Sequence, residues 1–385
     1  MKIGINGYEA VVPRFGHNKE TGLPNRVGSG EFCFQLLSKL SKIDTSNEYS
    51  VFLPVEPSSD MPKEKEKWKY VVFHSKKLWT LLDLSKKLKN YKLDVFFSPT
   101  HYLPLYTSSP SVISILDVSY LYFPNLFKKK DLYQLRLWGG YSIKKAKKII
   151  TISNSSKNDI IKMYKVNPDK VSVVYPGIKQ DLGLKIKDLS MNDLSKKYGI
   201  KGDYILFVGT LQPRKNIVKL IEAFSLIRNH KSSIGDLSLV IVGKKGWQFE
   251  DILNAPKKYN VEDRVKFLDS VSDENLPSLY KNAFCFCLPS LYEGFGLPIL
   301  EAMQYGCPVA TSSVSSLPEA GGDAAVYFDP ENVEDIKKSL ESIIQSSELR
   351  DKLIKKGYEQ VKKFSWEKTA RETLKVLEEV GNKHE

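Results

Sequence analysis

Residues 204–228, YILFVGTLQPRKNIVKLIEAFSLIR, contain a sequence pattern that indicates the fold class. The apolar run YILFV comes first, and such a run suits a strand that is buried on both faces of a parallel sheet. A glycine turn follows, and apolar side chains then recur three or four residues apart at Ile217, Leu220, Ile221, Phe224 and Ile227. That spacing predicts an amphipathic helix. Strand, loop and helix in this order form the repeating unit of a doubly wound α/β fold.

The same alternation extends over the whole chain, with a break in the middle. Apolar runs predict strands at 2–6, 49–53, 70–74, 95–98, 112–116, 148–152 and 171–175, and then at 204–208, 237–242, 265–268, 283–288, 309–311 and 325–328. Between the two sets lies a polar stretch, 177–203, in which we expect the hinge. The sequence therefore predicts two Rossmann-like domains with parallel sheets, at 1–180 and 181–364.

Length and composition agree with two globular domains. The chain has 385 residues, of which 42% are hydrophobic and 27% charged. It has no apolar run of membrane-spanning length, and its start, MKIGINGYEA, lacks the features of a signal peptide. We therefore expect a cytoplasmic protein. The four cysteines lack the spacing of a zinc site, so we expect buried thiols.

The positive charge is concentrated in the first half of the chain. Residues 1–180 hold 29 basic and 15 acidic residues, a net +14, whereas residues 181–385 hold 29 and 30, a net −1. Three interpretations are open: a solvated lysine-rich surface, an anionic membrane leaflet or acceptor, and nucleic acid. No zinc-finger, RRM or helix-turn-helix pattern is present, so we expect no nucleic-acid partner.

The first candidate binding segment is residues 209–216, GTLQPRKN, directly after a predicted strand. Ligands of open α/β sheets bind beyond the carboxyl ends of strands and at helix N-termini. Arg214 and Lys215 are adjacent cations that could neutralise a diphosphate there. The pattern GxxxxGK[ST] is absent, so this is not a Walker A loop. The alternative is that both charges are simply solvated.

The second candidate segment is residues 290–306, SLYEGFGLPILEAMQYG, after the predicted strand at 283–288. Glu293 precedes a Gly-Phe-Gly turn, and Glu301 lies inside the helix that we expect to follow. Glycines let backbone amides approach a ligand closely, and a carboxylate can accept hydrogen bonds from two vicinal ribose hydroxyls. The alternative is an exposed turn residue at 293 and a charge on its own helix at 301.

A third, weaker candidate is the turn formed by Gly28, Ser29 and Gly30 before a helix predicted over Glu31–Leu40. Two glycines at a helix N-terminus could approach a phosphate or a sugar. A simple turn explains this pattern equally well.

Three motifs together resemble the family 4 retaining glycosyltransferases of the GT-B fold. They are VGTLQPRKN (208–216), IVGKKGW (241–247) and PSLYEGFGLPILEAMQYGCPVATSSVSSLPEAGGDAAVYFDP (289–330). The resemblance implies two facing Rossmann-like domains, with a nucleotide-sugar donor bound by the second. It also implies that the last helix, within 365–385, crosses back to pack on the first domain.

The resemblance assigns roles by position. It implies that Glu301 holds the donor ribose, that Glu293 contacts donor-sugar hydroxyls, and that Lys215 and Arg214 bind the diphosphate. The remaining donor-side residues that it implies are Gly209, Thr210, Gly294, Phe295, Gly296 and Leu297, with Gly28 and Gly30 reaching donor phosphate or acceptor.

The chain departs from the family pattern at several positions. Thr210 stands where many relatives have Arg, and Glu31 stands where they have a cation. Relatives often show His-Asp where this chain has Leu116-Asp117, and His where Phe97 stands. Asp117 remains a catalytic candidate, and His101 nearby is a candidate on the acceptor side.

We therefore predict metal-independent transfer of a hexose, with retention, from GDP-mannose or a UDP-sugar to a glycan or lipid-linked acceptor. No D-x-D motif occurs in the sequence, and no cofactor is expected. The basic first half motivates the hypothesis that the enzyme works at the inner face of the cytoplasmic membrane. The alternatives are a catalytically weak sugar-nucleotide-binding or partner subunit, for which the missing His before Asp117 is the motive, and an epimerase on the same fold.

Overall fold

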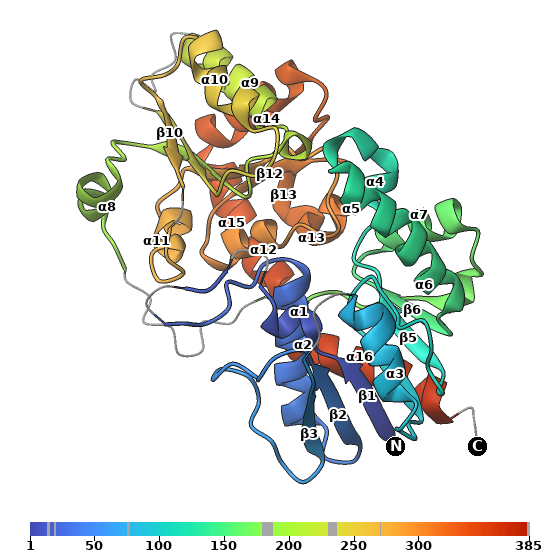
Figure 1. Cartoon of the computed structure of the whole chain (residues 1–385). Helices are drawn as coiled ribbons and strands as arrows, with labels where there is room; N and C mark the ends of the chain where they lie inside the picture. Colours follow the sequence, from blue (N-terminus) through green and yellow to red (C-terminus); the bar gives the residue numbers. More distant parts are fainter. Residues whose placement is uncertain are drawn as a thin grey trace. The chain divides into compact units, whose positions relative to one another are not determined.

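The computed structural model describes residues 1–13, 16–18, 21–74, 78–178, 188–229, 237–269 and 271–382. The chain divides into two compact units, one made of Met1–Gly177 and Phe364–Glu385 and the other of Ile178–Lys363 (Figure 1). The first boundary predicted from the sequence lies between residues 180 and 181, which are outside the described residues, and the second lies between 364 and 365.

The first unit is built on a seven-stranded parallel sheet in the order β3-β2-β1-β4-β5-β6-β7. Its strands are β1 Lys2–Asn6, β2 Glu48–Leu53, β3 Trp68–Val72, β4 Val95–Ser98, β5 Ser111–Ser114, β6 Lys148–Thr151 and β7 Val171–Val173. The order reverses between β1 and β4, which makes this pair the switch point of the sheet.

The second unit is built on a six-stranded parallel sheet in the order β10-β9-β8-β11-β12-β13. Its strands are β8 Tyr204–Val208, β9 Ser238–Val242, β10 Val265–Leu268, β11 Cys285–Leu288, β12 Val309–Ser312 and β13 Ala325–Phe328. Here the order reverses between β8 and β11. Both sheets therefore have the doubly wound topology that the sequence predicts.

The helices alternate with these strands along the chain. In the first unit they are α1 Tyr8–Val11, α2 Ser29–Ile43, η1 Trp79–Asp83, α3 Leu84–Leu88, α4 Ser119–Tyr122, η2 Pro124–Leu126, α5 Lys129–Gln134, η3 Leu135–Gly139, α6 Gly140–Lys145, α7 Asn154–Tyr164, η4 Pro168–Lys170 and α16 Trp366–Gly381. In the second they are α8 Met191–Tyr198, η5 Pro213–Lys215, α9 Ile217–Asn229, α10 Glu250–Lys258, α11 Leu276–Lys281, α12 Leu297–Gln304, α13 Leu317–Gly321, η6 Gly322–Ala324, α14 Val333–Gln345 and α15 Ser347–Val361.

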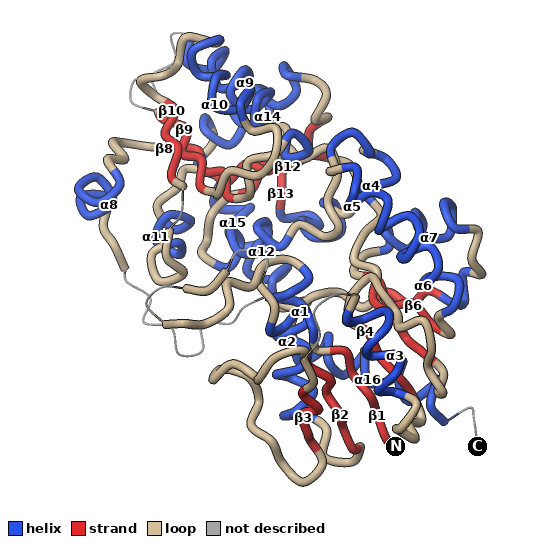
Figure 2. Tube along the Cα trace, viewed as in Figure 1, coloured by secondary structure: helices blue, strands red, loops and turns tan. Residues whose placement is uncertain are grey.

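Helices cover both faces of the second sheet, which explains its continuously apolar strands. Figure 2 shows α9, α10 and α14 on one side of this sheet and α12 and α15 on the other. Every residue of β11 and β12 is buried, as are the first four of β8. Burial on both faces removes the alternation of apolar and polar residues that a half-exposed strand would show.

The last helix, α16, belongs to the first unit, where it lies beside strands that are distant in sequence (Figure 1). A Cβ added at Gly177 would lie 2.0 Å from the backbone nitrogen of Trp366, so glycine is required for this contact. Thr369 donates a hydrogen bond to the carbonyl of Tyr175 at 2.7 Å. Ser365 caps this helix, because the backbone N–H of Lys368 donates to Ser365 Oγ at 3.2 Å.

Some element boundaries differ from the predicted ones. Strand β3 begins at Trp68, two residues before the predicted strand at 70–74. The polar stretch 177–203 contains α8, which the analysis did not predict. Ser190 and Asp193 cap this helix reciprocally, and Gly199 ends it in the left-handed conformation at φ 63°. Among the described residues, no helix is both long and apolar enough to cross a bilayer.

Candidate functional site

The two strongest candidate segments follow β8 and β11, the neighbouring strands at the switch point of the second sheet. Residues 209–216 leave the carboxyl end of β8, and residues 289–296 leave the carboxyl end of β11. In an open parallel sheet the flanking connections diverge at such a point and leave a crevice for ligands. The fold therefore brings both segments to the same place.

The segment after β8 lies on the neighbouring loop at 243–247. The backbone N–H of Leu211 donates to the carbonyl of Lys244 at 2.9 Å, and that of Gly246 donates to Leu211 at 2.9 Å. A Cβ at Gly243 would lie 1.9 Å from the carbonyl oxygen of Gly209, so this approach requires glycine. The segment at 241–247 thus packs against residues 209–216, which we call the cationic loop because they contain Arg214 and Lys215.

The cationic loop directly contacts residues 289–296, which we call the acidic loop because they contain Glu293. Lys215 Nζ donates to Glu293 Oε1 at 2.5 Å, and Arg214 Nη1 donates to Glu293 Oε2 at 3.2 Å. Arg214 also donates to the carbonyl of Tyr292, and Leu291 N–H donates to the carbonyl of Arg214 at 2.9 Å. All three charged side chains are mostly buried: Lys215 is 11% exposed, Arg214 15% and Glu293 10%. Glu293 is therefore not the exposed turn residue of the alternative interpretation.

This environment fixes the charge of Glu293. Burial alone would raise the pKa of its carboxyl. The positive charges of Lys215 and Arg214, with hydrogen bonds from Lys215 and Ser290, instead lower that pKa to about 2. Glu293 is therefore an anion at neutral pH. It can accept hydrogen bonds from hydroxyls, but it has no proton to donate as a general acid.

Two serines that the sequence analysis missed hold the backbone of Glu293. Its N–H donates to Ser315 Oγ at 3.1 Å, while its carbonyl accepts from Ser315 Oγ at 2.5 Å and from Ser316 Oγ at 2.9 Å. Ser315 has φ 58°, a conformation that few non-glycine residues adopt. Both serines follow β12, the next strand of the sheet, and the run SSVSS gives no indication of which hydroxyl would point to Glu293.

The Gly-Phe-Gly turn leads from Glu293 into α12. Gly294, Phe295 and Gly296 are buried, and Leu297 is half-buried. Gly296 has φ 102°, and a Cβ there would lie 2.7 Å from Leu317, so this position requires glycine. Glu301 is half-buried in α12, and its Oε2 accepts a hydrogen bond from Tyr280 Oη at 3.0 Å. This contact between Tyr280 and Glu301 was not predicted from the sequence.

Gly209 and Thr210 are half-buried at the carboxyl end of β8. They belong to the same loop as Lys215, residues 209–216. With one net positive charge from Lys215, Arg214 and Glu293, this edge is suited to a diphosphate on the cations and to hydroxyl groups on the carboxylates.

The remaining candidates lie in the first unit, at the carboxyl ends of its own strands. Helix α2 begins at Ser29, two residues earlier than predicted, so Gly28 is its N-cap, with φ 53°, and Gly30 lies inside its first turn. A Cβ at Gly30 would lie 3.0 Å from the carbonyl oxygen of Glu9. Close packing of α2 on α1 therefore explains Gly30 without a ligand.

His101 and Asp117 follow β4 and β5, which are neighbours in the first sheet. Asp117 Oδ1 accepts hydrogen bonds from the N–H of Ser119 at 2.9 Å and from its Oγ at 2.7 Å. The His101 ring lies 6.4 Å from the Tyr102 ring, centroid to centroid. Both side chains are half-buried.

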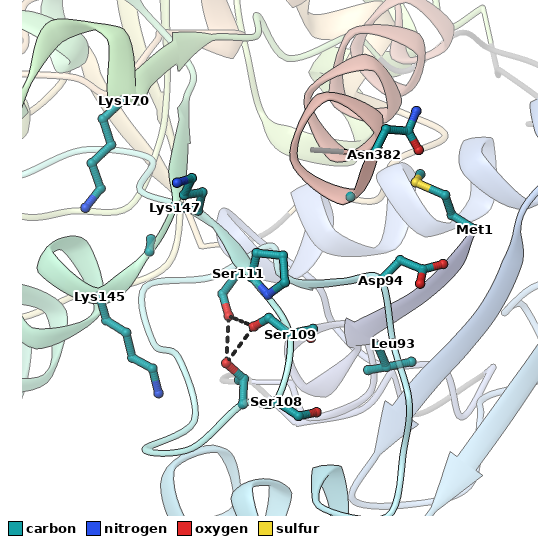
Figure 3. A pocket seen from close by; sticks show the side chains of 14 residues that line it. Met1, Leu93, Asp94, Ser108, Ser109, Ser111, Lys145, Lys147, Lys170 and Asn382 are labelled. Atoms are coloured by element: carbon teal, nitrogen blue, oxygen red, sulfur yellow. Dashed lines mark hydrogen bonds between the residues drawn. The ribbon is translucent and has the colours of Figure 1, made fainter. Parts of the chain in front are cut away.

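A groove of about 950 Å³ lies at the opposite edge of the first sheet. Figure 3 shows Lys145, Lys147 and Lys170 on one side of it and Met1 and Asp94 on the other. These residues precede strands, whereas ligands of parallel sheets bind where strands end. We therefore do not assign the chemistry to this groove.

The four cysteines are buried and form no disulfide. Within the described ranges, no group of three or more His, Cys, Asp or Glu side chains is arranged to hold a metal ion. That the reaction needs no metal stays a prediction.

Comparisons with known proteins bear on the family and the fold of the chain. The family model for "Glycosyl transferases group 1" matches residues 190–360, and that for "Glycosyltransferase Family 4" matches residues 54–182. O-antigen chain mannosyltransferase B of Escherichia coli is 32% identical over 74% of this chain and 74% of its own. O-antigen chain mannosyltransferase RfbU of Salmonella typhimurium is 29% identical over 72% and 71%. The structure of Anabaena HepE in complex with UDP-glucose matches with a TM-score of 0.70 and 18% identity, over 98% of this chain and 100% of its own, and this likeness confirms the predicted fold.

Proposed function

This chain belongs to the family 4 glycosyltransferases of the GT-B fold, and we propose that it transfers a hexose, with retention, from a nucleotide-diphosphate sugar to a glycan or lipid-linked acceptor. The observation that carries the proposal is the buried contact of Lys215 and Arg214 with Glu293 at the switch point of the second sheet. This contact puts cations for a diphosphate beside a carboxylate for sugar hydroxyls.

Transfer breaks the bond between the anomeric carbon and a diphosphate oxygen, and it forms a bond from that carbon to the acceptor oxygen. Negative charge grows on the departing diphosphate, and Lys215 and Arg214 stabilise it there. The proton of the acceptor hydroxyl passes to the departing phosphate oxygen. Glu293 does not take part as an acid or base, because its pKa of about 2 leaves it a weakly basic anion. Its role is to orient the sugar hydroxyls.

The names of the relatives favour one donor among the candidates. Two of them are named O-antigen chain mannosyltransferases, which supports GDP-mannose as donor and a cell-envelope polysaccharide as acceptor. The Anabaena structure holds UDP-glucose, so UDP-sugars remain candidates. No metal is part of this proposal, because Lys215 and Arg214 supply positive charge to the diphosphate.

A thermal-shift screen of nucleotide sugars with EDTA present tests the proposal. A ligand that binds the folded state raises the melting temperature by mass action. We expect GDP-mannose, or else one UDP-hexose, to stabilise the chain and to yield a glycosylated acceptor with the anomeric configuration of the donor. Loss of binding in EDTA would contradict metal independence, and an inverted product would contradict retention.

We further propose that the first unit docks on an anionic leaflet at the cytoplasmic face of the membrane. In the helical segment α5–η3–α6, Leu132 and Leu135 pack on the core, yet Tyr133, Leu137 and Tyr141 are 65%, 48% and 37% exposed. These three residues are spaced four apart. The segment therefore presents large apolar side chains to solvent as well as to the core.

The apolar surface continues beyond this segment, and the segment is rich in basic residues. Tyr141 Oη donates to the carbonyl of Leu105 at 3.0 Å, and Leu105 and Tyr106 are also exposed. Residues 128–148 contain eight basic residues and one acidic residue, a net +7. Aromatic and aliphatic side chains among lysines suit the interface of an anionic bilayer.

Vesicle flotation with and without phosphatidylglycerol tests the docking surface. We expect the chain to float with anionic vesicles, and the variant Tyr133→Ser/Leu137→Ser/Tyr141→Ser to lose this binding. Tyr358→Ser is the matched control, because Tyr358 is 46% exposed in the second unit. Equal flotation with neutral and anionic vesicles would overturn the docking proposal and leave the transferase proposal intact.

A further inference from the structure

Tyr280 of α11 connects the core of the second unit to the proposed ribose carboxylate. Its Oη lies 3.0 Å from Glu301 Oε2 on α12. The ring is fully buried: it lies edge-on to Phe286 of β11, with centroids 5.6 Å apart, and stacked on Tyr305, with centroids 6.0 Å apart. A ring packed on two sides has little freedom to move.

The hydroxyl of Tyr280 is the donor in this hydrogen bond. Burial raises the pKa of Tyr280 well above its usual value, and the negative charge of Glu301 raises it further. The phenol therefore stays protonated over the whole physiological range. The carboxylate of Glu301 accepts, and a hydrogen bond to an ionised acceptor is stronger than one between neutral groups.

We propose that Tyr280 is a positioning residue, whose hydroxyl holds the Glu301 carboxylate in the orientation that accepts the two ribose hydroxyls of the donor. This inference rests on the proposed function, because it takes a nucleotide as the ligand. A half-buried glutamate rotates about three side-chain bonds, and fixing one of its oxygens removes most of that freedom before the donor arrives. A carboxylate accepts about four hydrogen bonds, so a bond from Tyr280 is compatible with two from a diol.

A purely structural role makes a different prediction. In that case Glu301 would serve only to satisfy the buried hydroxyl of Tyr280. Loss of this hydrogen bond would then lower stability without affecting nucleotide binding. Tyr204 of β8 provides the matched control. It is also fully buried, and its Oη donates to the carbonyl of Leu279 at 2.7 Å, a backbone group.

The test compares Tyr280→Phe with Tyr204→Phe in titrations with GDP, UDP and inorganic pyrophosphate. Each variant removes one buried hydroxyl and keeps the ring, so we expect similar losses in melting temperature. Tyr280→Phe should raise the Kd of the nucleoside diphosphate about 3- to 10-fold, which corresponds to the net free energy of one ordinary hydrogen bond. Pyrophosphate has no ribose, so its Kd should stay unchanged. Tyr204→Phe should change neither Kd.

Two further measurements keep the proposal falsifiable. In a Glu301→Ala background, Tyr280→Phe should cause no additional loss of affinity, and 2′,3′-dideoxy nucleotides should bind the wild type and Tyr280→Phe equally. An unchanged nucleotide Kd in Tyr280→Phe, or an equal loss for pyrophosphate, would overturn the positioning role alone. If the wild type bound neither GDP nor UDP, the proposed function would fail first, and this inference with it.

Discussion

The carboxyl edges of the two sheets are built differently. In the second unit, side chains from the loops after β8 and β11 converge, and Lys215 and Arg214 share the carboxylate of Glu293. In the first unit, the predicted residues follow three separate strands, and Asp117 forms its hydrogen bonds with Ser119, two residues further along the chain. The difference indicates that the second unit is preorganised for a charged ligand, as a diphosphate leaving group requires.

The largest expected effect on transfer comes from removing a cation at the carboxyl edge of the second sheet. Lys215→Ala should lower kcat of transfer about 100- to 1,000-fold, the usual loss when one donor to a developing negative charge is deleted. Steady-state kinetics with the donor found in the screen provide the measurement. Lys245→Ala, at an exposed lysine of the adjoining loop, should retain activity. Unchanged turnover in Lys215→Ala would remove the contrast between the two edges.

The next effect concerns stability. Glu293→Gln leaves two mostly buried cations without their anionic partner, and breaking a buried pair in this way costs about 3–5 kcal/mol. We expect a clear fall in melting temperature. A nucleoside diphosphate supplies the missing negative charge, so saturating GDP or UDP should stabilise Glu293→Gln more than it stabilises the wild type. Equal stabilisation of both proteins would place the diphosphate elsewhere.

The pH dependence of stability sharpens the same point. The pKa of Glu293 is lowered in the folded state from 4.5 to about 2. A lowered carboxyl pKa contributes stability that is complete above 4.5 and is lost as pH falls from there toward 2. Denaturation curves across this window should therefore fall more steeply for the wild type than for Glu293→Gln. Parallel curves would mean that the carboxylate is not held by the cations.

A smaller effect is expected at the first edge. Asp117→Asn keeps an oxygen that can accept from Ser119 but removes the negative charge. If Asp117 acts on the acceptor, transfer should fall at least about tenfold, which is less than the loss typical of a direct acid–base catalyst. The thermal shift with donor should stay unchanged. A loss of donor binding in Asp117→Asn would contradict the assignment of donor binding to the edge of the second sheet and of the acceptor to the edge of the first.

The proposed donor edge could be predicted from the sequence because its parts are local. Each loop follows an apolar strand and carries its own charge or glycine pattern, and the parallel topology then brings the ends of β8 and β11 together. The same logic predicted both doubly wound sheets. Ser315 and Tyr280 escaped prediction because their roles depend on side-chain direction across elements. Ser315 reaches Glu293 from the loop after β12, and Tyr280 reaches Glu301 from the helix before β11.

The first edge was harder to predict for a related reason. Gly30 had a functional interpretation in the sequence, whereas close packing against Glu9 explains it in the structure. His101 and Asp117 carry no local pattern that distinguishes a ligand-binding side chain from one that stabilises its own turn. For such residues only a substrate-dependent measurement separates the two roles.

We propose that the second unit binds the donor through Lys215, Glu293 and Glu301. Calorimetric titration of the preferred nucleoside diphosphate into the wild type, Lys215→Ala, Glu301→Ala and Asp117→Asn tests it most directly. We expect at least about a tenfold higher Kd for Lys215→Ala and Glu301→Ala, equivalent to about 1.4 kcal/mol each, and an unchanged Kd for Asp117→Asn. Wild-type affinity in both Lys215→Ala and Glu301→Ala would contradict it.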